Sequence, residues 1–521
     1  MLRKLAVLAS VLGLIGIALV SGQAAAQAAA PKLKNGGSMT IGVVGTNWYP
    51  LDPPAFANGT AQVNYFDAVF GELFIEEPNG TMQPDLAQSY KYSSNDENIT
   101  ITLRKGLEFS NGMPITPQDM QWNFTRDMIT TTACSCHPCF TDVMSVSVSG
   151  PRSVTVHMKT PNATLINCFE GHAPNYLIPE SLWKSEGSTN FGLHPIGAGP
   201  YKVVTDDLSS KLVLTKNANY YKKGLPLLNS LTFLALGADQ SALEALQSGQ
   251  IQLAVGVSTP NIIGQAKKDG IRVQTIKATS MGALQFNTNE APFNNVLARE
   301  AVAAAIDPGP ILKAAASGQG TVGEGMQGPG GLFYSKTVPG YHGYNLAQAK
   351  ADVKKLGGLS FTIQGGNTPA QETEEEAIAS ELTAAGIKAT LVPEELTVEV
   401  ENFAKGAWNI ILGCGGGVDP DVGACAYPER FISHAEYSGT VNPALDKAIA
   451  KQVDNVSNAT RSAAEQTINA IVAKNVYAVP LYAANTYVLS SPKINLTDVG
   501  PGGGGAIGVT VDFDNLAYLQ Q

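Results

Sequence analysis

The chain has 521 residues, more than a single hydrophobic core usually serves, so two or three lobes are expected. Charged residues make up 15% of the sequence and the formal net charge is −10, a low-charge, acidic composition that fits an exported soluble protein. This balance, with no Lys/Arg cluster to offset it, excludes nucleic acid and anionic membrane surfaces as partners.

The N-terminus has the pattern of a secretory signal. Arg3 and Lys4 precede an apolar run over residues 5–20, and a segment of small residues follows. We predict cleavage near Ala26–Ala30. A retained membrane anchor is the alternative, which the small-residue segment disfavours. No cysteine follows the apolar run, so a lipoprotein is not expected, and no second long apolar segment occurs.

The first predicted elements are a strand, a loop and a helix. Met39–Val44 is a short apolar strand, and residues 46–53 form a loop. Tyr65–Phe74 carries apolar residues at helical spacing and is predicted to be a helix that packs in a core.

The segment from Pro84 to Trp122 is predicted in most detail. Ser89–Tyr92 and Ile99–Leu103 alternate as strands around a polar turn, which predicts a hairpin. Asn111-Gly112 marks a tight turn because both residues tolerate positive φ. A helix then begins after Thr116, the predicted N-cap, with a proline at its first position and a carboxylate, Asp119, in its first turn.

This segment resembles the signature of the family 5 extracellular solute-binding proteins, the dipeptide, oligopeptide and nickel-type receptors of ABC importers. The phrases that carry the resemblance are Pro84-Asp85-Leu86-Ala87, Leu103-Arg104-Lys105-Gly106, Phe109-Ser110-Asn111-Gly112 and Thr116-Pro117-Gln118-Asp119. His194–Lys202 and Gln285–Asp307 are further blocks of the same kind, and the resemblance extends from about Met39 to Tyr518.

The six cysteines indicate disulfides, because their number is even and the chain is expected to be exported. Cys414 and Cys425 bracket a Gly/Asp-rich loop and are predicted to close it. Cys168 is expected to pair with one of Cys134, Cys136 and Cys139, and the sequence leaves open which one. A zinc site in this cluster is possible by donor count, but the cramped spacing favours disulfides. The cluster is expected in a loop on the second lobe.

The middle of the chain predicts a parallel sheet. Lys211–Thr215 and Leu231–Leu236 read as strands, Asp239–Ser248 as an amphipathic helix ended by Gly249, and Ile251–Val255 as the next strand. A strand, a helix and a strand of these lengths form a crossover between parallel strands.

The last third continues the α/β pattern. Phe286 ends a strand, and Asn294 or Asn295 caps the helix that follows. The remaining predicted helices are 345–356, Gln371–Ala385, Leu445–Asp454 and Ala459–Lys474. The remaining predicted strands are Leu359–Ile363, Ile387–Val392, Trp408–Leu412, Ala478–Tyr482, Tyr487–Leu489 and Val509–Phe513.

No catalytic motif is present. HExxH, GxSxG, a phosphate loop and a dinucleotide fingerprint are all missing. Glu374–Glu376 is interpreted as a solvated helix face, and Asp419 and Asp421 are expected to shape a turn. We therefore predict a protein that is not an enzyme and needs neither a metal nor a cofactor. A secreted hydrolase is the competing class, suggested only by the acidic loop.

The resemblance implies an α/β fold of the periplasmic-binding-protein type: a two-lobed clamp of class II with an extra subdomain in the first lobe. The expected boundaries are 1–30 for the signal peptide, 31–72, 191–280 and 485–521 for lobe I, 73–190 for the extra subdomain, and 281–484 for lobe II.

The resemblance also implies a function. The mature protein is expected to be a monomeric periplasmic receptor that captures a small solute by hinge closure and delivers it to the permease subunits of an ABC importer. The positions at which the family places ligand contacts are occupied here by Trp48, Tyr49, Asn287, Trp408, Cys414, Gly416, Asp419 and Tyr482.

One departure from the family bears on the solute. Peptide-binding members place an Asp in the loop equivalent to 413–421, where it pairs with the ammonium of the peptide, and the matching position here is Gly416. A buried ammonium needs such a partner. A free peptide amino terminus is therefore disfavoured unless Asp419 or Asp421 substitutes, but a peptide stays the leading expectation because most members of the family bind peptides. The alternatives are an oligosaccharide or other non-peptide solute, and a metal chelate.

Overall fold

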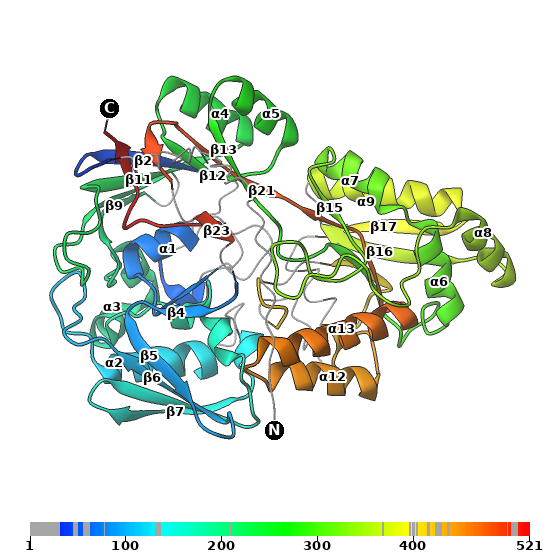
Figure 1. Ribbon diagram of the computed structural model, residues 1–521, viewed down its shortest axis with the longest axis horizontal. Helices are drawn as coiled ribbons and strands as arrows, with labels where there is room; N and C mark the ends of the chain where they lie inside the picture. Colours follow the sequence, from blue (N-terminus) through cyan, green and yellow to red (C-terminus); the bar gives the residue numbers. More distant parts are fainter. Residues whose placement is uncertain are drawn as a thin grey trace, which may run out of the picture.

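The computed structural model describes residues 32–44, 51–55, 63–77, 79–130, 137–207, 210–366, 369–394, 398, 402, 405–413, 417–421, 430–434, 438–496, 499–501 and 509–520. The predicted signal segment lies outside these ranges. Within them the chain forms two lobes and a third unit beside the first, each with its own sheet and core (Figure 1). The predicted two-lobed α/β fold with an extra subdomain is confirmed. No helix in the described ranges is long and apolar enough to cross a bilayer.

Lobe I is built on a seven-stranded sheet with strands from distant parts of the chain. In spatial order these are β13 (Arg272–Ile276), β21 (Thr486–Ser490), β12 (Leu253–Val257), β2 (Ser38–Val44), β11 (Ser230–Leu236), β10 (Lys211–Lys216) and β9 (Tyr201–Asp207). β2 lies between two parallel partners, β11 and β12, so the predicted crossover is confirmed. β21 pairs antiparallel with both β12 and β13.

Helices and short strands complete lobe I. They are α1 (Val63–Phe70), α3 (Glu180–Leu193), α4 (Asp239–Ser248), α5 (Pro260–Lys268), β1 (Leu33–Lys34), β22 (Ile494–Asn495), β23 (Val499–Pro501), β24 (Val509–Val511) and β25 (Ala517–Leu519). α4 ends at Gly249, as predicted, where φ is 76°. The predicted helix 65–74 is too long: Gly71 has a φ of 64°, which ends α1, and Phe74 already begins a strand.

The extra subdomain contains a four-stranded antiparallel sheet, one helix and several short helical turns. The strands are β5 (Ala87–Tyr92), β6 (Asn98–Leu103), β8 (Ser153–Met158) and β7 (Val143–Gly150), with a separate hairpin of β3 (Phe74–Glu76) and β4 (Met82–Pro84). The helical segments are α2 (Pro117–Phe124), η2 (Thr125–Thr130), η3 (His137–Phe140), η4 (Leu165–Phe169) and η5 (Ala173–Asn175). The predicted start of α2 is confirmed, because Thr116 and Asp119 form a reciprocal capping box.

Lobe II is built on a mixed five-stranded sheet. In spatial order its strands are β17 (Lys388–Glu394), β16 (Ser360–Gly366), β18 (Ile410–Gly413), β14 (Ala283–Phe286) and β19 (Ala478–Pro480). The other elements are β15 (Gly320–Val322), β20 (Tyr482–Ala484), α6 (Val296–Ala305), α7 (Pro308–Ala316), α8 (Leu346–Lys355), α9 (Pro369–Ala384), α12 (Pro443–Val453) and α13 (Asn458–Asn475). Asn295, one of the two predicted candidates, caps α6. The interpretation of 374–376 as a solvated face is wrong for Glu375, which is 1% exposed.

Within the described residues, the chain crosses between the lobes from β13 to β14 and again from β20 to β21 (Figure 1). The first crossing is packed against a glycine-rich segment of lobe II. Gly328 N donates to Thr279 O at 2.8 Å, and Gly330 N donates to Ala278 O at 2.9 Å. A Cβ at Gly331 would stand 2.1 Å from the carbonyl oxygen of Thr279, so only glycine fits there.

Candidate functional site

The extra subdomain and lobe II meet at a junction formed by residues 162–172 on one side and by residues 417–421 and 453–461 on the other. Ala163 N donates to Val453 O at 3.0 Å, and Asn167 Nδ2 donates to Asp419 Oδ2 at 2.5 Å. A cavity of about 240 Å³ lies at this junction and is lined from both sides. α12 and α13 of lobe II lie next to the subdomain here (Figure 1).

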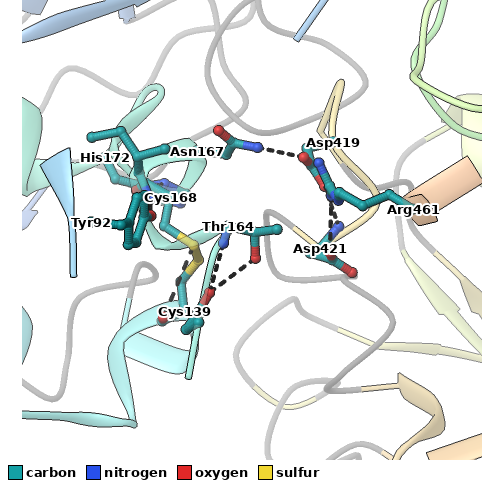
Figure 2. Close-up of a disulfide and its surroundings, with 11 residues drawn as sticks. Tyr92, Cys139, Thr164, Asn167, Cys168, His172, Asp419, Asp421 and Arg461 are labelled. Atoms are coloured by element: carbon teal, nitrogen blue, oxygen red, sulfur yellow. Dashed lines mark hydrogen bonds and ion pairs between the residues drawn. A yellow bond between two sulfur atoms is a disulfide. The ribbon is translucent and has the colours of Figure 1, made fainter. Parts of the chain in front are cut away.

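Arg461 organises the lobe II side of the junction. Its Nη2 lies 2.6 Å from Asp419 Oδ1 and 3.0 Å from Asp421 Oδ2, and all three side chains are buried (Figure 2). The guanidinium also lies 5.2 Å from the centre of the Phe333 ring. Asp419 is therefore an occupied partner: one oxygen accepts from Arg461 and the other from the Asn167 amide of the subdomain.

Carboxylates outnumber the cation at the junction. Burial and the charge of Asp419 raise the pKa of Asp421 well above its usual range. Burial, with the charges of Glu170 and Asp419, does the same for Glu76 of β3. Burial alone would lower the pKa of Arg461, but its two carboxylate partners raise it. Within the described ranges this excess of acid favours a cationic or neutral group over an anionic one.

A disulfide lies directly beside the contact between the two sides. Cys139 of η3 is bonded to Cys168 of η4, next in sequence to Asn167 (Figure 2). This settles the partner of Cys168 that the sequence left open. Cys168 belongs to the core of the extra subdomain, so the expectation that the cluster sits on the second lobe is wrong for Cys139. Cys134 and Cys136 lie outside the described residues.

The other predicted contact residues fall in different places. Trp48, Tyr49, Cys414, Gly416 and Cys425, the predicted partner of Cys414, all lie outside the described residues.

The structure places the remaining three at two ends of the lobe II sheet. Asn287 Nδ2 donates to Trp408 O at 3.0 Å, so these two residues sit where β14 ends and β18 begins, and both are buried. Tyr482 lies at the opposite end, where its carbonyl accepts from Gly282 N at 2.9 Å. Its hydroxyl is hydrogen-bonded to Glu374 of α9.

Sequence reasoning missed Arg461 and Asn167. Arg461 lies in the first turn of α13, where the helix dipole disfavours a cation. A cation at this unfavourable position indicates that carboxylates elsewhere in the fold compensate its charge. Asn167 carried no such signal. No cluster of three or more His, Cys, Asp or Glu side chains suited to a metal ion occurs in the described parts of the chain.

Comparison with known families gives a match over most of the chain. The model for the middle region of the bacterial extracellular solute-binding proteins, family 5, matches residues 81–431. A similar curated protein is the glutathione-binding protein GsiB of Salmonella choleraesuis, which is 26% identical over 323 residues. The match covers 61% of this chain and 62% of that protein's length.

Solved structures share the fold. A dipeptide-binding protein from a Pseudoalteromonas species, in complex with Met-Leu, has a TM-score of 0.75 at 17% identity and covers 92% of this chain and 100% of its own. NikA of Brucella suis, in complex with Fe(III)-EDTA, has a TM-score of 0.75 at 20% identity with the same coverage. At these identities the likeness establishes the two-lobed fold.

Proposed function

Because the chain belongs to family 5 of the bacterial extracellular solute-binding proteins, we propose that it is the periplasmic substrate-binding component of an ABC importer. It captures a small solute between its lobes and delivers it to the membrane permease. The observation that carries this proposal is the pairing of two features. In the described residues two segments of the chain connect the lobes. Away from these segments, the buried contact of Asn167 with Asp419 and Arg461 joins the extra subdomain to lobe II.

Closure in such a molecule is a population shift. A solute that contacts both lobes binds the closed state better than the open state and so moves the equilibrium toward closure. The glycine-packed crossing is the natural hinge, and the junction is made only when the lobes approach. We keep the predicted domain division as part of this proposal, except that α3 (Glu180–Leu193) is assigned to lobe I, whose core contains Phe191. Separate cores in the two lobes and the subdomain support this division.

A peptide is the leading solute. The similar curated protein binds glutathione, itself a tripeptide, and a structural neighbour holds a dipeptide. Asp419 is already bound to Arg461, so it is not a free partner for a peptide ammonium. A non-peptide solute is the second candidate, because the same fold holds Fe(III)-EDTA in another neighbour. Trp48, Tyr49, Cys414 and Gly416 stay proposed contacts, with Asn287, Trp408, Asp419 and Tyr482.

The remaining features follow from this role. The N-terminal segment is proposed to direct export and to be cleaved near Ala26–Ala30, leaving a soluble, monomeric protein without enzymatic activity. Size-exclusion chromatography and N-terminal sequencing of the exported protein test these points.

The function is tested by a thermal-shift screen of the mature protein. The panel contains dipeptides, oligopeptides, glutathione, oligosaccharides and metal chelates. A solute at 100 times its Kd stabilises the folded state by about 2.7 kcal/mol, which raises Tm by a few degrees. A shift with peptides supports the leading assignment, and a shift only with another class replaces it. Turnover of a peptide, ester or glycoside that is lost in Asp419→Asn would overturn the receptor assignment.

A further inference from the structure

A second cavity lies away from the junction, where α2 and η2 of the subdomain approach α3. Its volume is about 460 Å³, within the range of small-molecule sites. Its lining includes Trp122, Trp183, Arg126, Asp52, Ser188 and Thr130. We call it the tryptophan pocket. Nothing in the proposed transport role uses it.

Two indole rings and one guanidinium form the wall. The ring centroids of Trp122 and Trp183 are 5.3 Å apart, and both rings are half-buried. The Arg126 guanidinium lies 4.7 Å from the Trp122 ring and 5.5 Å from the Trp183 ring. A cation already occupies this aromatic pair, so a second cation has little to gain there. The ring surface that lines the cavity suits apolar C–H groups of a ligand.

The polar groups of the pocket hold one another in place. The Asp52 carboxylate accepts from Trp183 Nε1 at 2.9 Å and from Ser188 Oγ at 2.5 Å. Arg126 Nη1 lies 3.4 Å from Asp52, and Arg126 Nε lies 2.5 Å from Asp127. Arg126 is 7% exposed and is held between the two carboxylates, so it forms a fixed polar wall beside the rings.

The backbone of this wall is itself unusual. α2 continues into η2, a π-helical segment over Thr125–Thr130. In a π-helix residue i+5 lies above residue i, and Thr130 Oγ1 accordingly donates to Thr125 O at 3.1 Å. The wider turn brings Thr125, Arg126 and Thr130 to the same cavity. Single π-helical turns occur frequently at functional sites.

The charges select the ligand class. Two carboxylates, Asp52 and Asp127, already face the one guanidinium, so an anionic ligand would meet excess negative charge. The cavity offers aromatic ring surface and the hydroxyl groups of Thr125, Thr130 and Ser188, and its paired charges leave no place for a net charge, which fits a neutral molecule with many hydroxyl groups. We propose that the tryptophan pocket is a second binding site, for a neutral monosaccharide or disaccharide, separate from the solute site between the lobes.

Isothermal titration calorimetry of the mature protein tests this. The probes are glucose, galactose and maltose, with glucuronate and glucosamine as charged comparisons. We expect saturable binding of at least one neutral sugar and weaker binding of its charged analogues. Trp122→Leu is expected to lower the affinity at least tenfold, and Ser188→Ala, a milder change, several-fold.

Ser185→Ala is the matched control for Ser188→Ala. Ser185 is an exposed residue of α3 that does not line the pocket, so affinity should stay within twofold of the unaltered protein. Circular dichroism verifies that each variant is folded. Absence of saturable binding by every neutral sugar would overturn the proposal. So would tighter binding of glucuronate, or a sugar affinity unchanged in both folded pocket variants, which would place the sugar between the lobes.

Discussion

At the residue scale, Asp419 belongs to the architecture of the junction as much as to any solute site. The Asp419 carboxylate accepts hydrogen bonds from Arg461 of its own lobe and from Asn167 of the subdomain, so its negative charge is already compensated. A free carboxylate for a peptide ammonium must therefore come from another residue.

Asp419→Asn is expected to lower the free energy of unfolding. Arg461 would lose one of two carboxylates while remaining buried, and breaking a buried pair is costly. Since Asp421 still pairs with Arg461, we expect a loss on the order of 2–3 kcal/mol, below that for a fully stranded charge. Urea denaturation measures it. Asp269→Asn, on an exposed turn, is the control and should change little; equal effects of the two variants would contradict the role of the pair.

His172 is expected to make the subdomain sensitive to acid. Burial lowers its pKa from 6.5 to about 4, so the unfolded chain binds a proton between these values and the folded protein does not. Stability from the neutral imidazole is therefore present above pH 6.5 and is lost as pH falls toward 4, in total on the order of 3 kcal/mol. Asp67, whose pKa is raised to about 8, opposes this trend because it takes up its proton in the folded state.

Because the two trends oppose each other, the contribution of His172 is measured as the difference in unfolding free energy between the unaltered protein and a His172 variant. Unfolding of the unaltered protein and of His172→Gln is followed from pH 7.5 to pH 4. The gap between their stabilities should narrow or reverse as pH falls. Parallel profiles would show that His172 is protonated equally in both states.

At the element scale, the first crossing between the lobes depends on glycine. Gly331→Ala should destabilise the protein by about 1–3 kcal/mol, because its Cβ would meet the Thr279 carbonyl. Gly264 in α5 is the matched control: its Cβ would meet nothing within 4 Å, so Gly264→Ala should stabilise by about 0.5–1 kcal/mol. Differential scanning calorimetry measures both variants. A Tm that rises for Gly331→Ala would contradict the packing.

The Cys414–Cys425 disulfide stays a prediction, since both residues lie outside the described ranges. An 11-residue separation closes a short loop, so its contribution should be about 3 kcal/mol or less, and the longer Cys139–Cys168 loop should contribute slightly more. Peptide mapping of the exported protein without reduction decides the pairing. Recovery of Cys414 and Cys425 as free thiols would reject it.

Elements with local signals could be predicted from the sequence. The capping box at Thr116 and Asp119 and the stop of α4 at Gly249 depend only on neighbouring residues. The junction could not be predicted, because Asn167 and Asp419 are 252 residues apart and nothing near either one indicates the other. Glu375 was misassigned for the same reason: its burial depends on what α9 packs against.

At the scale of the whole molecule, the junction is expected to control how tightly a solute is held. Asn167→Ala removes the amide that the subdomain gives to Asp419, which favours the open state, so the apparent Kd should rise several-fold. Calorimetry gives the affinity, and small-angle scattering reports compaction on binding. Asn190→Ala, an exposed position on α3, is the control. An unchanged Kd and compaction would show that the contact does not contribute to closure.

The position of β21 has a consequence for the order in which the protein is assembled. The described helices and strands of lobe II all precede residue 485, whereas the lobe I sheet has a gap between β12 and β13 until β21 at 486–490 arrives. A chain that emerges N-terminus first can therefore fold lobe II while the sheet of lobe I is still incomplete. The first lobe depends on pairings across most of the sequence and should be the slower to form. Nascent chains cut before β21 should yield a protease-resistant second lobe and a digestible first.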